Sequence, residues 1–304
     1  MPSVESDALR AHFASFSERI ASDPDAGIGT IRRMLEELHE RSSEPTNISY
    51  EEVRAGSRSA ILCIPYNLVV DGAVLYLHGG GFVANSMHSH RKLAGHLASR
   101  LGAPVLVLDY RLAPESPFPA ALDDASDAVD WLAGQGFARE RIAFAGDSGG
   151  GNLATALALR LRGEGSPLPA AIVAFSPWYD LECTGSTFDT NAATDAFVQK
   201  QVALGMAAMY LNGVSPANAL ASPLNADLRG LPPMYIASGD KETLQDDTDR
   251  FVDRARAAGV DITHERSAGM QHIYVVMAGR APEADTTIAN AAAWLQEKLR
   301  EAGS

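Results

Sequence analysis

Residues 141–157 read RIAFAGDSGGGNLATAL, an apolar run followed by glycines and then a helical pattern. The run at 142–145 is typical of a buried strand, and the pattern at 152–157 is typical of a helix. Between them, residues 146–150 fit G-x-S-x-G around Ser148. Glycine removes side chains that would clash in a tight turn. We therefore expect a strand that turns sharply into a helix and presents the Ser148 hydroxyl as a nucleophile.

Two other kinds of loop could carry the same glycines. An ordinary glycine-rich connection between strand and helix needs no catalytic serine, but the strand and helix on either side favour the nucleophile. A phosphate-binding loop would require a following Gly-Lys-Ser/Thr, which this chain lacks there. The carboxylate of Asp147 would also repel a phosphate group, so we discount that alternative.

Strand-like and helical patterns alternate along most of the chain. This alternation predicts an α/β fold with a mostly parallel sheet and helices on both faces. The expected strands lie near residues 48–53, 59–66, 73–81, 103–110, 141–148, 170–177, 233–240 and 260–267, and the expected helices near 121–134, from 150, from 246 and at 288–299.

Two segments stand apart from this alternation. Apolar residues recur at helical spacing before residue 45, which predicts two amphipathic helices ahead of the first strand. Residues 181–223 then interrupt the alternation and hold one helical pattern, which includes Phe197, Met206 and Tyr210. An insertion of this kind often forms part of a pocket. An ordinary crossover helix with a long loop is an equal alternative.

Composition limits the kinds of partner. The chain has 304 residues, 46% of them hydrophobic and 21% charged, which suits one large globular domain with a small cap. Its formal net charge of -13 disfavours nucleic acid and anionic membrane surfaces, which would repel it. The two cysteines, Cys63 and Cys183, suggest buried structural thiols rather than disulfides or a metal site. The first twenty residues show no secretory signal and no apolar run spans a bilayer, so we expect a cytoplasmic protein.

A nucleophilic serine needs a base, and in a strand-turn-helix arrangement of this type the order is serine, acid, histidine. Only His264 and His272 follow Ser148 in the chain. His264 lies inside an expected strand, so we interpret it as a packed or surface residue of that strand. His272 lies in the loop that follows, where a base at the edge of the sheet belongs. We therefore predict His272 as the base.

The acid should follow the strand near 233–240 and orient the imidazole. Asp240, Glu242, Asp246 and Asp247 all lie there. Asp246 and Asp247 begin a helical pattern, where the helix dipole favours acidic side chains, so we interpret them as structural. The residues alone leave Asp240 and Glu242 as alternatives.

Catalysis by such a serine also needs amide donors for the oxyanion. His78-Gly79-Gly80-Gly81 ends an expected strand and offers nearly unobstructed backbone N–H groups, and Gly149 follows the nucleophile directly. His78 precedes Ser148 in chain order, so we assign it a structural role.

Together these motifs resemble the hormone-sensitive-lipase-like esterases, family IV of the bacterial carboxylesterases, within the α/β-hydrolase superfamily. The resemblance runs in order over roughly residues 45 to 300 and is specific, because several motifs occur in register. They are HGGGF at 78–82, DYRLAPE at 109–115 with FPAALDD at 118–124, GDSGGGN at 146–152, and GMQH at 269–272.

The resemblance implies an eight-stranded, mostly parallel sheet flanked by helices, with residues 46–304 as the catalytic domain. It implies a helical cap formed by residues 1–45 and the insertion at about 181–223, and oxyanion donors from Gly80, Gly81 and Gly149. The family's acid stands two residues before a leucine, which is Leu244 here, and one branch uses glutamate. Glu242 is therefore the expected acid, with Asp240 as the alternative.

The family usually has alanine where Gly149 stands and often histidine where Ser116 stands. Neither departure removes a member of the expected triad. No cofactor or metal is expected, and the resemblance favours a homodimer.

These features predict a carboxylesterase that acts on a small-molecule ester, with a Ser148-Glu242-His272 triad and an acyl-enzyme intermediate. The soluble, acidic character of the chain favours short- to medium-chain acyl esters. An amidase or a hydrolase of bulky synthetic esters would share the same triad. A non-catalytic small-molecule receptor on this scaffold is disfavoured, because every triad position is filled.

Overall fold

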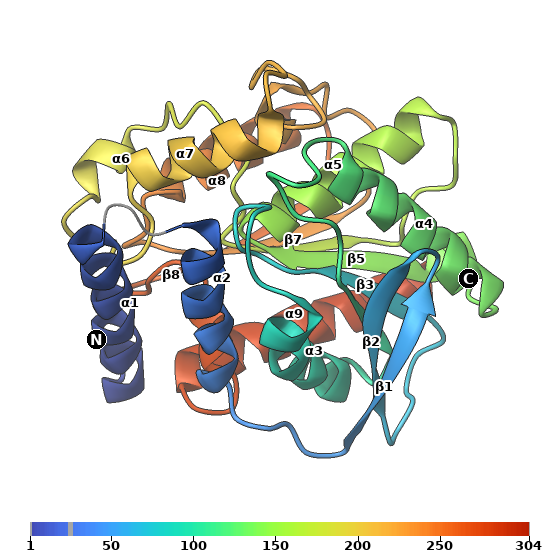
Figure 1. The fold of residues 1–304 in the computed structure, drawn as a ribbon. Helices are drawn as coiled ribbons and strands as arrows, with labels where there is room; N and C mark the ends of the chain where they lie inside the picture. The colour runs from blue at the N-terminus through green and yellow to red at the C-terminus, as the bar shows by residue number, and fades with distance from the viewer. Residues whose placement is uncertain (1, 24–26, 304) are drawn as a thin grey trace.

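The computed structural model describes residues 2–23 and 27–303, and it contains one eight-stranded sheet covered by helices on both faces (Figure 1). The strand order is β1-β2-β4-β3-β5-β6-β7-β8. Strand β2 runs antiparallel to both of its neighbours, and the other pairs are parallel. The mostly parallel sheet expected from the sequence is therefore confirmed. The strands are β1 (Ile48–Ala55), β2 (Arg58–Pro65), β3 (Ala73–Leu77), β4 (Val105–Leu108), β5 (Ile142–Asp147), β6 (Ile172–Phe175), β7 (Met234–Gly239) and β8 (Ile262–Ser267).

The central strands are short and apolar because both of their faces are covered. Every residue of β3, β4, β5, β6 and β7 is buried, as is usual in parallel sheets. Helices α3 (Met87–Leu101) and α9 (Pro282–Glu301) cover one face, and α4 (Ala120–Gly134), α5 (Gly149–Gly163) and α8 (Gln245–Ala257) cover the other (Figure 1). Short 3₁₀ turns complete the fold at η1 (Glu37–Glu40), η2 (Arg139–Arg141), η3 (Pro223–Asn225) and η4 (Tyr274–Met277).

The register of the parallel strands brings their carboxyl ends to one edge. Leu77 of β3 pairs with Gly146 of β5, and Asp147 of β5 pairs with Phe175 of β6. The loops that follow β3, β5, β6 and β7 therefore begin beside one another. This edge is where a ligand site is expected in an α/β sheet.

The two helices expected before the sheet are present as α1 (Val4–Ser22) and α2 (Ile28–Glu36). The inward-facing side chains of α1 are buried, with Phe13 stacked on Phe197 at a ring separation of 4.3 Å. The Ser17 hydroxyl donates a hydrogen bond of 2.8 Å to the carbonyl oxygen of Ala196. The N-terminal helices thus pack against the segment that joins β6 to β7, far away in the sequence (Figure 1).

That connecting segment holds two helices rather than the single helical pattern expected. Helix α7 (Lys200–Leu211) is the predicted one, and α6 (Thr187–Thr190) is an additional single turn. Four residues are too few to show a helical repeat, so the sequence pattern could not reveal α6.

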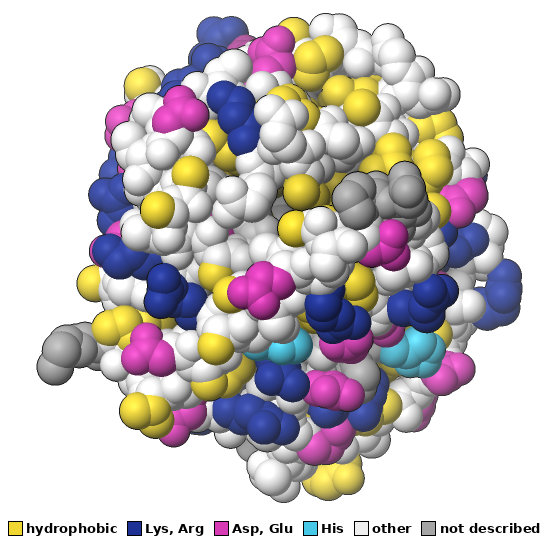
Figure 2. Space-filling view, turned by 60° about the vertical axis from the view of Figure 1, so that its left-hand side comes forward, with side chains coloured by type: hydrophobic (Ala, Val, Ile, Leu, Met, Phe, Trp, Pro, Cys, Tyr) yellow, Lys and Arg dark blue, Asp and Glu magenta, His cyan; other side chains and the backbone are white. Residues whose placement is uncertain are grey.

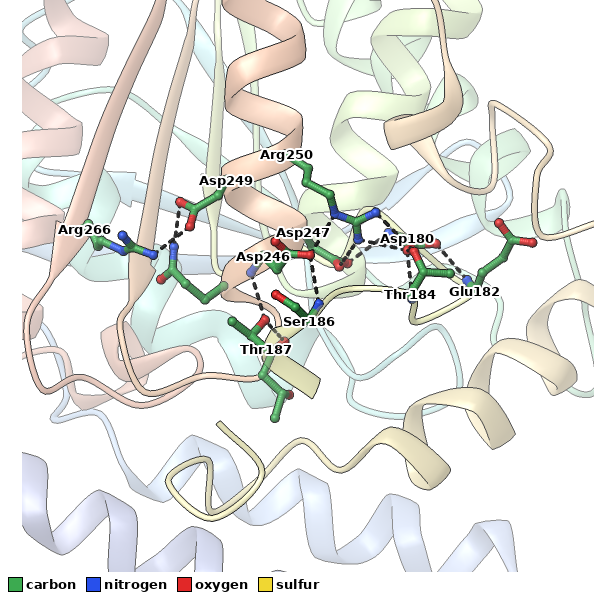
Figure 3. A network of polar contacts seen from close by, with 12 residues as sticks. Asp180, Glu182, Thr184, Ser186, Thr187, Asp246, Asp247, Asp249, Arg250 and Arg266 are labelled. Carbon is green, nitrogen blue, oxygen red and sulfur yellow. Dashed lines mark hydrogen bonds and ion pairs between the residues drawn. The ribbon is translucent and has the colours of Figure 1, made fainter. Parts of the chain in front are cut away.

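A polar network fixes the start of this segment to α8 (Figure 3). The Arg250 guanidinium donates to Asp180 at 3.0 Å and to Asp247 at 3.2 Å, and Asp247 also accepts from the Asp180 backbone N–H at 3.0 Å. Burial, and then the charge of Asp180, raise the pKa of Asp247. Asp246 and Asp247 lie in the first turn of α8, so their structural interpretation holds.

The remaining sequence expectations concern cysteines and membrane spans. Cys63 and Cys183 are buried free thiols. Within the described ranges, no helix has both the length and the apolar character that a bilayer crossing demands.

Candidate active site

Ser148 lies at the turn between β5 and α5, in a backbone conformation that only a strongly supported residue adopts. Its φ of 52° and ψ of -121° fall outside the regions that non-glycine residues favour. Three hydrogen bonds support the turn: its N–H donates to Phe175 O at 2.9 Å, and its carbonyl accepts from Asn152 N and Trp178 N. The strained turn places Ser148 at the carboxyl edge of the sheet, between β5 and α5.

The glycines around Ser148 are required by close packing of α5 on β3. A Cβ built on Gly150 would overlap the Leu77 carbonyl, and one built on Gly146 would lie 2.5 Å from the backbone of Gly150. Real Cβ atoms do not approach backbone so closely. Each glycine is therefore needed by the tight turn.

His272 and Glu242 form a buried pair at the same edge of the sheet. The Nδ1 atom of His272 lies 2.7 Å from Oε2 of Glu242, and both side chains are almost completely inaccessible to solvent. The other oxygen of Glu242 accepts from Gly239 N at 2.6 Å and from the Ser176 hydroxyl at 3.1 Å. Ser176 in turn accepts from Ile273 N at 3.0 Å, which ties the acid to the histidine loop.

The charges of this pair are coupled. Burial raises the pKa of Glu242, although the hydrogen bond to His272 opposes that effect. Burial by itself would lower the pKa of His272. The hydrogen bond to Glu242 and the charge of Glu242 outweigh that effect, so the pKa of His272 is raised. The carboxylate thus stabilises the protonated imidazole.

The alternative acid and base occupy other positions. Asp240 accepts a 2.7 Å hydrogen bond from the N–H of Gly269 and lies 3.5 Å from the Lys241 amine, so it supports the loop before His272. His264 lies in β8, with its Nε2 atom 3.2 Å from the Ser238 hydroxyl. The structure therefore brings Glu242, and not Asp240, to His272.

The loop after β3 lies beside the nucleophile turn. Gly80 and Gly81 have φ values of 104° and 59°, which glycine adopts without strain. A Cβ on Gly149 would lie 3.3 Å from the Cα of Gly81, so the two backbones nearly touch. In the part of the chain that the structure describes, no hydrogen bond uses the N–H groups of Gly80, Gly81 or Gly149.

A buried carboxylate holds this loop in place. Asp147 accepts from Gly79 N at 3.1 Å and from the Tyr76 hydroxyl at 2.8 Å, and His90 Nε2 lies 3.2 Å from it. Burial alone would raise the pKa of Asp147, but the charge and hydrogen bond of His90 outweigh it and lower that pKa. Asp147 therefore joins the nucleophile turn to the glycine loop.

His78 is structural, as its place in the chain suggests. Its ring stacks on Tyr110 at 4.1 Å, and burial lowers its pKa to about 3.

The chain matches known proteins over most of its length. Residues 74–276 match the α/β-hydrolase fold family. An acetyl-hydrolase of Streptomyces hygroscopicus is 39% identical over 290 residues, covering 89% of this chain and 96% of its own, and an esterase of Acinetobacter venetianus is 36% identical over 72% and 73%. A crystal structure of an esterase from the bacterial hormone-sensitive lipase family superposes with a TM-score of 0.93 at 40% identity, covering 98% of this chain and 99% of that one.

This chain belongs to the hormone-sensitive lipase family of α/β-hydrolase carboxylesterases.

In this esterase a cavity of about 300 Å³ contains Ser148 and His272. Its walls are mostly apolar and come from α1, α2 and the segment that ends in α7. Gly80, Gly81 and Asn85 lie on the side nearest the nucleophile turn. The remaining lining residues are Phe16, Ser17, Ile20, Ala21, Ile31, Leu35, Leu38, Trp178, Phe197, Val198, Gln199, Val202, Ala203, Met206, Leu244 and Ile273.

Three contributors to the esterase site were missed by sequence reasoning. Ser176 follows β6 at the same edge as Ser148, and its position after a buried strand was a usable signal. Asp195 lies in the insertion and binds the loop of Glu242 through Thr243. Asn85 follows the glycine loop by a few residues and lines the cavity. The last two depend on how distant segments meet.

Proposed function

We propose that this esterase hydrolyses short- to medium-chain acyl esters with a Ser148-Glu242-His272 triad and an acyl-enzyme intermediate. The observation that carries the proposal is the 2.7 Å contact between His272 and Glu242 at the wall of the cavity that also contains Ser148. A serine, a histidine and an acid that orients the histidine are the three parts that nucleophilic ester hydrolysis needs.

The first half of the proposed reaction forms the acyl-enzyme. Because Glu242 holds Nδ1, the Nε2 atom of His272 takes the hydroxyl proton of Ser148 as Oγ bonds to the ester carbonyl carbon. The oxyanion accepts hydrogen bonds from the N–H groups of Gly80, Gly81 and Gly149. The bond to the alcohol oxygen then breaks, and the protonated His272 returns its proton to the departing alcohol.

The second half releases the acid. A water molecule gives its proton to His272 Nε2 and its oxygen attacks the acyl carbon. The tetrahedral intermediate collapses, the bond to Ser148 Oγ breaks, and His272 restores the serine proton. The products are a carboxylic acid and an alcohol.

The cavity supports a modest substrate. Residues 1–45 and about 181–223 are proposed to act as a cap over the catalytic domain of residues 46–304. Helices α1, α2 and α7 all contribute to the walls of a cavity of about 300 Å³, which suits short and medium acyl groups.

Single substitutions test the triad. Ser148→Ala and Glu242→Ala should each reduce hydrolysis of p-nitrophenyl butyrate by at least about 1,000-fold, because the members of a triad act together. Asp240→Ala is the matched control and should retain most turnover. Full activity in Ser148→Ala would refute the mechanism, and collapse in Asp240→Ala alone would make Asp240 the acid.

Acyl length tests the substrate class. Among p-nitrophenyl esters from acetate to palmitate, kcat/KM should peak at or below about eight carbons, because longer chains exceed the cavity. A maximum at palmitate, increased by an oil-water interface, would contradict a cavity-limited esterase.

We also propose a cytoplasmic location and, on the family resemblance, a homodimer. Sedimentation of the purified chain distinguishes dimer from monomer.

A further inference from the structure

Asn85 is a polar side chain beside the glycine loop that nothing in the proposed mechanism uses. The N–H groups of Val83 and Ala84 both donate to Gly80 O at 3.1 Å, which turns the chain back over Gly80. Asn85 follows this turn with a φ of 68°, a conformation that asparagine tolerates better than most residues. A Cβ built on Gly80 would lie 3.0 Å from Asn85 Nδ2, so the carboxamide lies against the loop.

The Asn85 carboxamide has no partner among the residues that the structure describes. The residue is 6% exposed, and its Oδ1 atom is buried without a hydrogen bond. No hydrogen bond of Nδ2 is found within the described ranges either. Buried amides are almost always paired, because an unpaired one loses its hydrogen bonds to water without compensation.

The other polar side chains of the cavity are already committed. Ser17 donates to Ala196 O, Gln199 donates to Asp195 O at 2.9 Å, and the Trp178 ring N–H donates to Asp180 O at 2.9 Å. Ser148 and His272 are assigned to the reaction. Among the lining residues that the structure describes, Asn85 is therefore the uncommitted polar group, next to the expected oxyanion donors.

We propose that Asn85 is a substrate-binding subsite that selects esters with a hydroxyl group within a few bonds of the scissile carbonyl. Because Oδ1 is inaccessible to solvent, Nδ2 is the atom that the carboxamide offers to the cavity, and the oxygen of a substrate hydroxyl can accept a hydrogen bond from it. The contact of Asn85 with Gly80 requires the hydroxyl to lie near the reacting carbonyl. This inference rests on the proposed function, because it concerns the same site.

Three esters of similar size test the subsite. Ethyl butyrate has no hydroxyl, ethyl 3-hydroxybutyrate has one on the acyl side, and 2-hydroxyethyl butyrate has one on the alcohol side. The measured quantity is the kcat/KM of each hydroxy ester divided by that of ethyl butyrate. The two hydroxy esters report which side of the ester Asn85 binds.

Asn85→Gly removes the side chain and suits the positive φ. We expect it to lower the ratio for one hydroxy ester about fivefold, which corresponds to ~1 kcal/mol at 1.4 kcal/mol per tenfold. Asn47→Gly is the matched control, because Asn47 has a φ of 61° on the exposed surface, and it should leave both ratios unchanged. Equal ratios in wild type and Asn85→Gly would overturn the subsite.

Asn85→Asp gives an independent readout of position. A carboxylate here would oppose the oxyanion on the glycine loop, so kcat for all three esters should fall about tenfold or more near neutral pH. An unchanged kcat would place the side chain away from the reacting carbonyl and contradict the proposal. If the wild type fails to hydrolyse even ethyl butyrate and p-nitrophenyl butyrate, the proposed function fails instead, and the two failures are distinct.

Discussion

At the scale of single residues, the charge of Glu242 is the feature on which the proposed triad depends. It lies where water is excluded, it bonds to His272, Ser176 and Gly239, and it raises the pKa of His272. A general base must be unprotonated to accept the serine proton. The activity of this esterase should therefore decline as the pH falls through the raised pKa of His272, above its ordinary value of 6.5.

Glu242→Gln should keep the shape of the acid and remove its charge. The pKa of His272 should fall, because the charge that stabilises the imidazolium is gone. The acidic limb of the kcat/KM profile should move to lower pH, while kcat falls roughly 1,000-fold. A pH profile with p-nitrophenyl butyrate measures both effects, and an acidic limb that stays at the wild-type pH would contradict the assignment.

The sequence predicts Ser148, His272 and the glycine loop because each stands in a local pattern. It leaves Glu242 and Asp240 as alternatives, because both stand in one loop. A hydrogen bond from Gly269 N to Asp240, between residues 29 positions apart, distinguishes the two, because it holds Asp240 on the loop before His272. No local pattern contains such a contact.

At the scale of elements, the segment before α7 is bound to the loops that carry Glu242 and His272. The Asp195 carboxylate, which is 2% exposed, accepts from Phe197 N and Val198 N with one oxygen and from Thr243 N and the Thr243 hydroxyl with the other. Thr243 directly follows Glu242. Gln271, which precedes His272, accepts from Ala196 N at 3.0 Å and donates to Thr194 O at 2.9 Å.

Asp195→Asn should therefore disturb the acid loop from a distance. Its amide would face N–H donors, so at least one of these hydrogen bonds is lost, at a cost of about 1–3 kcal/mol in the free energy of unfolding. We expect kcat to fall more than KM changes. The acidic limb should shift to lower pH, because the charge of Asp195 contributes to the raised pKa of His272.

Asp189→Asn is the control, because Asp189 is an exposed side chain of α6 in the same segment. A change confined to KM in Asp195→Asn would show that Asp195 shapes only the cavity.

Element prediction succeeds where burial imposes a pattern. The continuous apolar runs at β3, β5, β6 and β7 follow from strands covered on both faces. The path of residues 191–199 follows instead from side chains such as Asp195 and Gln271, whose partners lie in other loops. Sequence patterns cannot show those partners.

At the scale of the whole molecule, buried histidines make stability depend on pH. The pKa of His78 is lowered to about 3 by burial, so the folded protein leaves it neutral while the unfolded chain protonates it below pH 6.5. Between those values the unfolded state binds more protons, and stability falls as the pH falls. His78 alone contributes a slope of about 1.4 kcal/mol per pH unit in that window.

His78→Asn should flatten that slope. Urea unfolding at pH 4.5, 5.5 and 6.5 should show a weaker loss of stability in the variant, by up to about 1.4 kcal/mol per unit, although the variant is less stable at pH 7. His88→Asn, at an exposed position, is the control. A slope equal to that of wild type would show that His78 does not titrate on unfolding.

The net charge of -13 predicts solubility and the exclusion of polyanions, but it does not describe the surface in detail. Figure 2 shows Lys and Arg side chains interspersed with Asp and Glu on one face, with hydrophobic side chains gathered toward the top. Composition gives only the net charge, whereas the fold determines which charged side chains lie next to one another on the surface.

The contact between Ser3 and Glu283 sets an order of events during synthesis on the ribosome. The Ser3 hydroxyl and N–H both donate to this carboxylate at 2.7 Å, across 280 residues of chain. At about 5–20 residues per second, α1 waits roughly 15–55 s for α9 to be made. Until Phe197 is made, Phe13 and Phe16 also lack the ring against which they pack. Helix α1 is thus made long before it can dock, and the nascent chain must be kept from aggregating during that interval.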